Sequence, residues 1–115
     1  MNYYVGKPGW IEVICGPMFA GKTEELIRRV IRMDYAKKNY IIFKPTIDNR
    51  YSESEVVSHN KRKVNAICVT SSTEIDNFLT DEHEAVIIDE VQFFDESIVE
   101  KAHELAEKGL RVIVG

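Results

Sequence analysis

The stretch that decides the fold is Gly16-Pro17-Met18-Phe19-Ala20-Gly21-Lys22-Thr23. An apolar, β-rich run at residues 10–15 precedes it, and apolar residues at helical spacing follow it from Lys22 onward. Its glycines predict a tight loop between a strand and a helix. A loop of this kind points successive backbone N–H groups and a helix N-terminus at one spot, so the stretch is predicted to bind phosphate.

Strands and helices are predicted to alternate along the rest of the chain. Further apolar runs at residues 40–43, 66–69, 85–88 and 110–115 are typical of strands. Between them, a helix from Lys22 is expected to end at residues 37–39, a short helix to begin at a capping box of Ser71 and Glu74, and a third to end at Gly109. The polar residues 48–63 predict a loop or a marginal hairpin. This order predicts an α/β fold, with a P-loop NTPase-type parallel sheet and helices on both faces.

Length and composition limit the possible partners. The 115 residues, 44% of them hydrophobic and 30% charged, fit one domain over residues 1–115. A net charge of -4 argues against a general binder of nucleic acid or acidic membranes. Apolar runs are far shorter than a membrane span, and the amino terminus lacks a signal-peptide pattern. Cys15 and Cys68 are interpreted as buried, reduced thiols, which favours a cytoplasmic protein.

The residues of the loop and of one strand end predict the chemistry of the site. The loop fits GxxxxGK[ST], in which Lys22 would neutralise the β and γ oxygens of ATP and the Thr23 hydroxyl would hold Mg²⁺. Asp89 follows the continuously apolar run 85–88, so it is predicted to be the acidic residue that joins the metal. Its alternative role is a plain helix cap.

Glu90 indicates more specifically which reaction the site performs. Beside a metal-binding aspartate, its carboxylate is placed to take a proton from the attacking nucleophile, either water or a substrate hydroxyl. The alternative is a solvated acid in one run with Asp95 and Glu96. The residues themselves do not separate an ATPase from a kinase.

Three segments in their order along the chain resemble the cytosolic thymidine kinases of the human type 1 and Gram-positive bacterial kind. They are the loop at 16–23, Lys44-Pro45 with Asp48-Asn49-Arg50-Tyr51, and Asp89-Glu90-Val91-Gln92-Phe93-Phe94. The Met-Phe inside the loop and the Gln-Phe-Phe after the acidic pair are specific, because ordinary P-loop proteins do not share them.

The resemblance implies a role for individual residues. Glu90 would deprotonate the 5′-hydroxyl of thymidine, Arg50 would reach toward the phosphates with Asp48 nearby, and Met18 and Phe93 would border the thymine ring. Simpler roles remain open: Phe93 and Phe94 as core residues, Met18 as a loop residue against the first helix, and Arg50 as a solvated residue. The implied nucleotide-binding set is Gly16, Pro17, Met18, Phe19, Ala20, Gly21, Lys22, Thr23, Asp48, Asp89 and Gln92.

The family pattern also extends beyond this sequence. It continues into a segment that completes the nucleoside pocket and into a lasso-like loop with a structural Zn²⁺, whose ligands are expected beyond Gly115; neither Cys15 nor Cys68 matches them. The sequence is therefore expected to be an amino-terminal portion, truncated before that loop, of a homo-oligomer that is a tetramer by analogy. The alternative functions are a P-loop ATPase, in which Glu90 activates water, and a nucleotide-binding module without catalysis.

Overall fold

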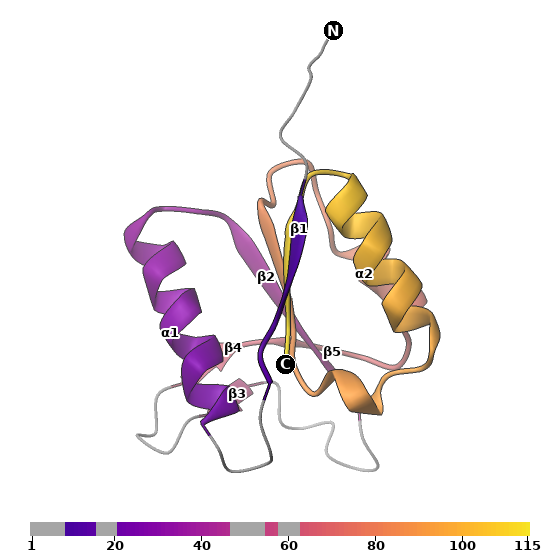
Figure 1. Cartoon of the computed structure of the whole chain (residues 1–115), viewed down its shortest axis with the longest axis horizontal. Coiled ribbons are helices and arrows are strands. Elements are labelled where there is room, and N and C mark those ends of the chain that lie inside the picture. The colour runs from indigo at the N-terminus through magenta and orange to yellow at the C-terminus, as the bar shows by residue number, and fades with distance from the viewer. Residues whose placement is uncertain (1–8, 16–20, 47–54, 58–62) are drawn as a thin grey trace, which may run out of the picture.

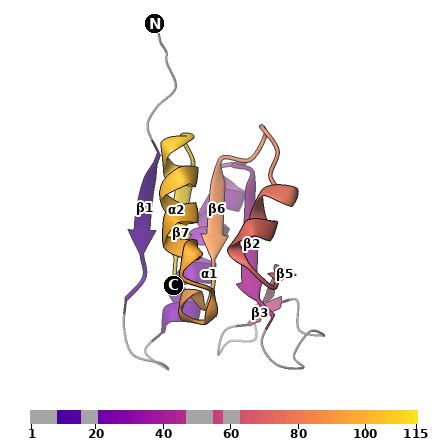
Figure 2. The ribbon, with the colours of Figure 1, turned by 90° about the vertical axis from the view of Figure 1, so that its right-hand side faces the viewer.

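A parallel five-stranded sheet forms the centre of the computed structural model, which describes residues 9–15, 21–46, 55–57 and 63–115. Figure 2 shows the strands side by side in the order β1-β7-β6-β2-β5. Their bounds are β1 (Trp10–Val13), β2 (Tyr40–Pro45), β5 (Ile67–Val69), β6 (Ala85–Ile88) and β7 (Arg111–Val114). The predicted α/β class and the parallel sheet are confirmed.

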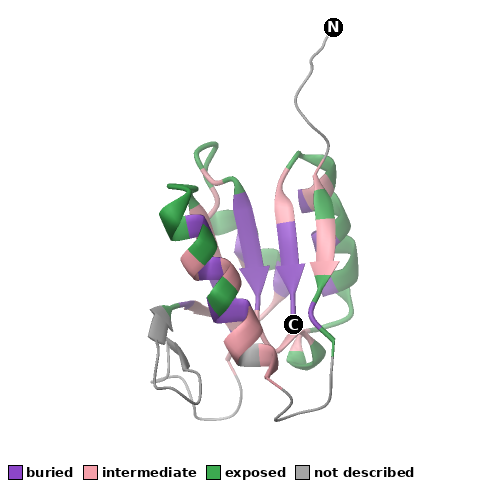
Figure 3. Ribbon diagram, turned by 60° about the vertical axis from the view of Figure 1, so that its left-hand side comes forward, coloured by how far each residue is buried: buried purple, intermediate pink, exposed green. Residues whose placement is uncertain are grey.

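Helices cover both faces of this sheet (Figure 1). One face packs against α1 (Lys22–Tyr35), which contributes Leu26, Ile27, Val30 and Met33 to a buried cluster. The other face packs against α2 (Ser97–Glu107) and the 3₁₀ helix η1 (Ser72–Asn77). Residues 85–88 of β6 are buried along their whole length (Figure 3), because apolar side chains from both layers cover this central strand.

Alternation along each strand decides which residues face which helix. Ile42, Ile87 and Ile113 belong to the cluster under α1, whereas Phe43, Ile88 and Val114 belong to the cluster under α2. Successive side chains of a strand point to opposite faces, so residues two further along continue on the same side. This rule places the polar residues that follow β2 and β6.

Several predicted boundaries shift by one or two residues. β1 ends at Val13, not at residue 15, and β2 continues through Pro45, which was expected to lie beyond its end. Pro45 fits because it is buried opposite Val69 of β5, and the N–H that bonds to the Val69 carbonyl at 2.9 Å comes from Thr46. The helix end predicted at residues 37–39 is confirmed by the left-handed backbone of Lys37, with φ of 57°.

The polar stretch forms the hairpin that was one of its two predicted structures. β3 (Glu55–Val57) and β4 (Lys63–Asn65) pair antiparallel, apart from the main sheet. The predicted capping box is formed in part. Ser71 is the N-cap of η1 and its backbone N–H donates to the Glu74 carboxylate, but the Ser71 side chain makes no capping hydrogen bond. The Glu74 carboxylate also accepts from the backbone N–H of Thr70 at 3.0 Å. The expected burial of both cysteines is also wrong: Cys15 is exposed beyond the end of β1, and Cys68 is half-buried.

Candidate functional site

The site lies at the carboxyl edge of the sheet, where α1 begins. Gly21 has a φ of 86°, a left-handed conformation that glycine adopts without a side-chain clash, and its carbonyl accepts from Glu25 N at 2.9 Å. Lys22 is the first residue of α1. The other predicted loop residues, Gly16, Pro17, Met18, Phe19 and Ala20, lie outside the described residues, as does the side chain of Thr23.

Asp89 directly follows β6. Its backbone N–H donates to the Phe43 carbonyl at 2.8 Å, which extends the pairing of β6 with β2 by one residue. Burial raises the pKa of Asp89 to about 6, and the neighbouring Glu90 carboxylate adds to the rise. The positive charges of Lys44 and Lys22 act in the opposite direction. The carboxyl group is therefore ionised near pH 7, and a bound cation would stabilise that form further.

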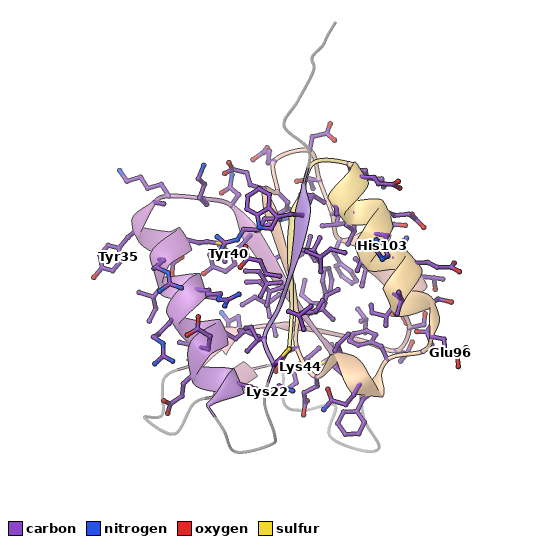
Figure 4. The ribbon with its side chains drawn as sticks, in the orientation of Figure 1. Lys22, Tyr35, Tyr40, Lys44, Glu96 and His103 are labelled. Atoms are coloured by element: carbon purple, nitrogen blue, oxygen red, sulfur yellow. The ribbon has the colours of Figure 1, made fainter. Side chains whose placement is uncertain are left out.

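Three charged residues meet on the α1 side of this edge. Asp89 lies two residues after Ile87, and Lys44 lies two residues after Ile42, so both continue the face that packs against α1. Phe43 pairs with Ile88 in the sheet, which makes Lys44 and Asp89 cross-strand neighbours. Lys22 comes to the same edge from the start of α1 (Figure 4). The structure thus brings together the predicted Lys22 and Asp89.

Glu90 turns the chain away from the sheet. Its φ of 53° and ψ of 47° are left-handed, which a residue with a side chain adopts at a cost of about 1 kcal/mol or more. Two hydrogen bonds hold this turn on the end of β7: the Gly115 carbonyl accepts from Val91 N at 3.0 Å, and Gly115 N donates to the Ile88 carbonyl at 3.0 Å. Uncommon backbone of this kind concentrates at functional sites, where it aims a side chain.

The segment after Glu90 is anchored at its far end as well. It contains the 3₁₀ turn η2 (Val91–Phe93) and reaches Asp95, whose carboxylate accepts from the backbone N–H of Ser72 at 2.9 Å and from its hydroxyl at 3.0 Å. These hydrogen bonds lower the pKa of Asp95. Ser72 is buried in η1. Residues 90–95 therefore form a short strap fixed to β7 at one end and to η1 at the other.

The aromatic pair on this strap divides between two environments. Phe93 is 51% exposed, so the alternative that it is a core residue is wrong. Phe94 is half-buried against the cluster under α2, which confirms a core role for that ring alone. Gln92, predicted to bind nucleotide, is exposed on the same strap.

A charge network braces the two elements that flank the phosphate loop. The Glu12 carboxylate on β1 accepts from Arg29 of α1 at 2.8 Å, from the indole N–H of Trp10 at 2.6 Å and from two nitrogens of Arg111 on β7. The hydrogen bond from Arg111 is the largest of the effects that lower the pKa of Glu12. The strand before the loop is thereby tied to the helix after it.

Asp48 and Arg50 lie outside the described residues. Within the described segments, no group of three or more His, Cys, Asp or Glu side chains could hold a metal ion. A Mg²⁺ site built on Asp89 is consistent with that finding, because Mg²⁺ commonly takes one or two carboxylates and completes its shell with water and substrate phosphate. Across the same segments, no helix is long and apolar enough to cross a membrane.

The structure adds residues for which sequence analysis proposed no role. Lys44 belongs to the Lys44-Pro45 segment of the family resemblance, but only its pairing beside Asp89 brings it to the site. No role was predicted for Ser72, and Asp95 was considered only in the alternative in which Glu90 is one of a run of solvated acids. No local signal links these two residues, which lie 23 positions apart.

Comparison with known families identifies the family of this chain. The family model described as thymidine kinase matches residues 9–115. The match includes β1, the start of α1 with Lys22, the end of β2 with Lys44, and the strap that begins at Asp89 and Glu90. It covers well over half of the chain, and the chain therefore belongs to the thymidine kinase family.

Proposed function

We propose that the protein transfers the γ-phosphoryl group of ATP to the 5′-hydroxyl of thymidine, giving thymidine monophosphate. The observation that carries this proposal is the meeting of Lys22 and Asp89 on one face of the sheet edge, directly followed by the left-handed Glu90. A P-loop lysine, a metal-binding aspartate and an adjacent base are the parts that phosphoryl transfer to a hydroxyl needs. Membership of the thymidine kinase family supports thymidine as the acceptor.

The proposed roles follow from charge and position. Lys22 neutralises the β and γ oxygens, while Asp89 and the Thr23 hydroxyl would hold Mg²⁺, which supplies positive charge against the phosphate oxygens. Glu90 accepts the proton of the 5′-hydroxyl as its oxygen forms a bond to the γ-phosphorus and the bond from that phosphorus to the β,γ-bridging oxygen breaks. ADP leaves with the bridging oxygen.

Other residues are proposed for substrate contacts. Phe93 is suited to border the thymine ring, because it is exposed on a strap whose two ends are anchored. Met18 is proposed for the same ring, and Gln92 and Asp48 for the nucleotide. Arg50 is proposed to stabilise charge on the γ-phosphoryl group.

The test uses ATP labelled in the γ-phosphate with the full-length protein, Mg²⁺ and thymidine. Label should appear in thymidine monophosphate, and Glu90→Gln should lower turnover about 10²- to 10⁴-fold, the usual contribution of a general base. Nucleotide affinity should hardly change, whereas Asp89→Asn should weaken Mg²⁺-ATP binding. Transfer to water alone, whether or not thymidine is present, would instead identify an ATPase.

A matched comparison separates catalysis from binding at the two carboxylates. If Glu90→Gln weakened ATP binding as much as Asp89→Asn and left the rate per bound complex intact, Glu90 would act on the metal and its role as base would be wrong. Arg50→Ala should lower turnover more than thymidine affinity, because its proposed partner is a phosphate. A change in the KM for thymidine alone would move Arg50 to the nucleoside pocket.

A further inference from the structure

Lys44 lies near Lys22 at one edge of the sheet (Figure 4), the edge at which Asp89 follows β6. It is carried by β2 itself, whereas Lys22 follows the phosphate loop. The backbone of β2 is held on both sides at this point, since Lys44 pairs with Cys68 of β5 and the next strand bond runs from Asp89 N to the Phe43 carbonyl. The position of Lys44 is thus set by the sheet.

The side chain of Lys44 shares its face with the phosphate site. Ile42, two residues earlier, packs in the cluster under α1, and so does Ile87, two residues before Asp89. Lys44 and Asp89 are therefore neighbours across two adjacent parallel strands, on the side where α1 begins. The strand order places β2 on the side of β6 away from β1, so Lys44 and the end of β1 lie on opposite sides of Asp89 along the sheet edge.

The negative charges at this edge of the sheet would be stabilised by a further cation. Asp89 and Glu90 are consecutive carboxylates, and a nucleoside triphosphate at this edge would add the negative charge of its phosphates. Lys44 is half-buried, and a partly desolvated lysine interacts more strongly with an anion than a solvated one does. Its ammonium group offers three donors that can follow a phosphoryl group as its oxygens move.

We propose that Lys44 contacts the γ-phosphate of bound ATP, as a second cation that approaches from the side of β2. This inference rests on the proposed ATP site. The γ-phosphate is the group concerned because Asp89, the cross-strand neighbour of Lys44, and the adjacent Glu90 are assigned to the transferred end of the nucleotide. The loop and Lys22, by contrast, are assigned to the inner phosphates as well.

The test compares two nucleotides that differ in the γ-phosphate. Full-length Lys44→Met should bind Mg²⁺ with the β,γ-imido analogue of ATP roughly ten- to hundredfold more weakly than the unchanged protein, as expected for loss of one charge-assisted hydrogen bond. Its affinity for Mg²⁺-ADP should be unchanged. Lys38→Met is the matched control: it removes the same charge from an exposed lysine just before β2, at the opposite end of that strand, where Lys38 pairs with Glu84 at 3.5 Å. It should leave both affinities unchanged.

Equal loss of affinity for both nucleotides would overturn the proposal, because it would mean that Lys44 acts only through Asp89 and the metal. Unchanged affinity for both would overturn it as well. If Lys44→Met does not fold, acetylation of lysines in the unchanged protein gives the answer: the ATP analogue should protect Lys44 more strongly than ADP does, and equal protection would refute the contact. Should the unchanged protein bind neither nucleotide, the ATP site itself would fail. If Lys44→Met selectively loses affinity for the ATP analogue but the unchanged protein does not phosphorylate thymidine, the Lys44 contact stands and the proposed acceptor fails.

Discussion

Glu12→Gln is expected to weaken the junction between β1 and α1. The carboxylate of Glu12 accepts four hydrogen bonds, from the indole of Trp10, from Arg29 and from two nitrogens of Arg111. Exposed fractions of 21% for Glu12, 22% for Arg29 and 30% for Arg111 place the network between a surface and a buried ion pair. A glutamine keeps one carbonyl acceptor but removes the charge, so two arginines remain side by side without their shared anion. The expected loss is about 2 kcal/mol in the free energy of unfolding at neutral pH.

The pKa of Glu12 determines how the stability difference between the two proteins changes with pH. Hydrogen bonding and attraction from the arginines hold the pKa of Glu12 below its ordinary value of 4.5 in the folded protein. A lowered folded-state pKa contributes stability above the unfolded-state pKa, and that contribution disappears as the pH falls through the folded-state value. The difference between the unchanged protein and Glu12→Gln should therefore be full at pH 7 and shrink steadily below the unfolded-state pKa.

Urea unfolding of both proteins, measured from pH 7 down to about pH 3.5, checks this expectation. The acid titration of all other groups is common to both proteins and cancels in the difference. A loss that stays constant across that range would refute the reasoning, since the effect would then come from altered packing and not from charge. Because Glu12 braces the strand before the loop against the helix after it, the affinity for Mg²⁺-ATP should also fall at pH 7.

Three further changes test other parts of the fold and site. Lys22→Ala should abolish phosphoryl transfer to thymidine in the full-length protein, and activity at the unchanged level would remove the P-loop role. Gly9→Ala should cost about 1–3 kcal/mol of stability in urea unfolding, because an added Cβ would lie 2.5 Å from the Ala106 carbonyl oxygen and closer still to that of Leu110; a neutral result would show that β1 can shift there. Ser72→Ala and Asp95→Ala should each lower turnover. Because the two side chains bond each other, the double variant should lose less turnover than the two single losses combined. Additive losses would show that the two residues act independently.

Local patterns of sequence were enough to predict the elements on which the proposed site residues lie. The strand that leads into the GxxxxGK[ST] loop and the helix that follows it are written in consecutive residues, as are the apolar run 85–88 and the acids after it. Periodicity and turn residues act over a few positions, so these signals can be recognised in the sequence without knowledge of the fold. For this reason Lys22, Asp89 and Glu90 could be named from the sequence.

Details that depend on competition between neighbours were predicted less well. The Glu74 carboxylate accepts from Thr70 as well as from the backbone N–H of Ser71, while the Ser71 side chain makes no capping hydrogen bond. β2 runs through Pro45, because Thr46 after it still donates to the Val69 carbonyl. The sequence did not decide between exposure and burial for Phe93 and Phe94; the structure leaves Phe93 exposed and half-buries Phe94 against the cluster under α2.

The strand order was decided only by the tertiary structure. β7 comes last among the strands of the sheet, yet it lies between β1 and β6, and β2 takes the other side of β6. Which strands pair depends on how both faces of the sheet are buried by α1 and α2, a property of the whole chain that no short window contains. That choice alone places Lys44 beside Asp89 and Gly115 beneath the turn at Glu90, although 45 residues separate Lys44 from Asp89 along the chain.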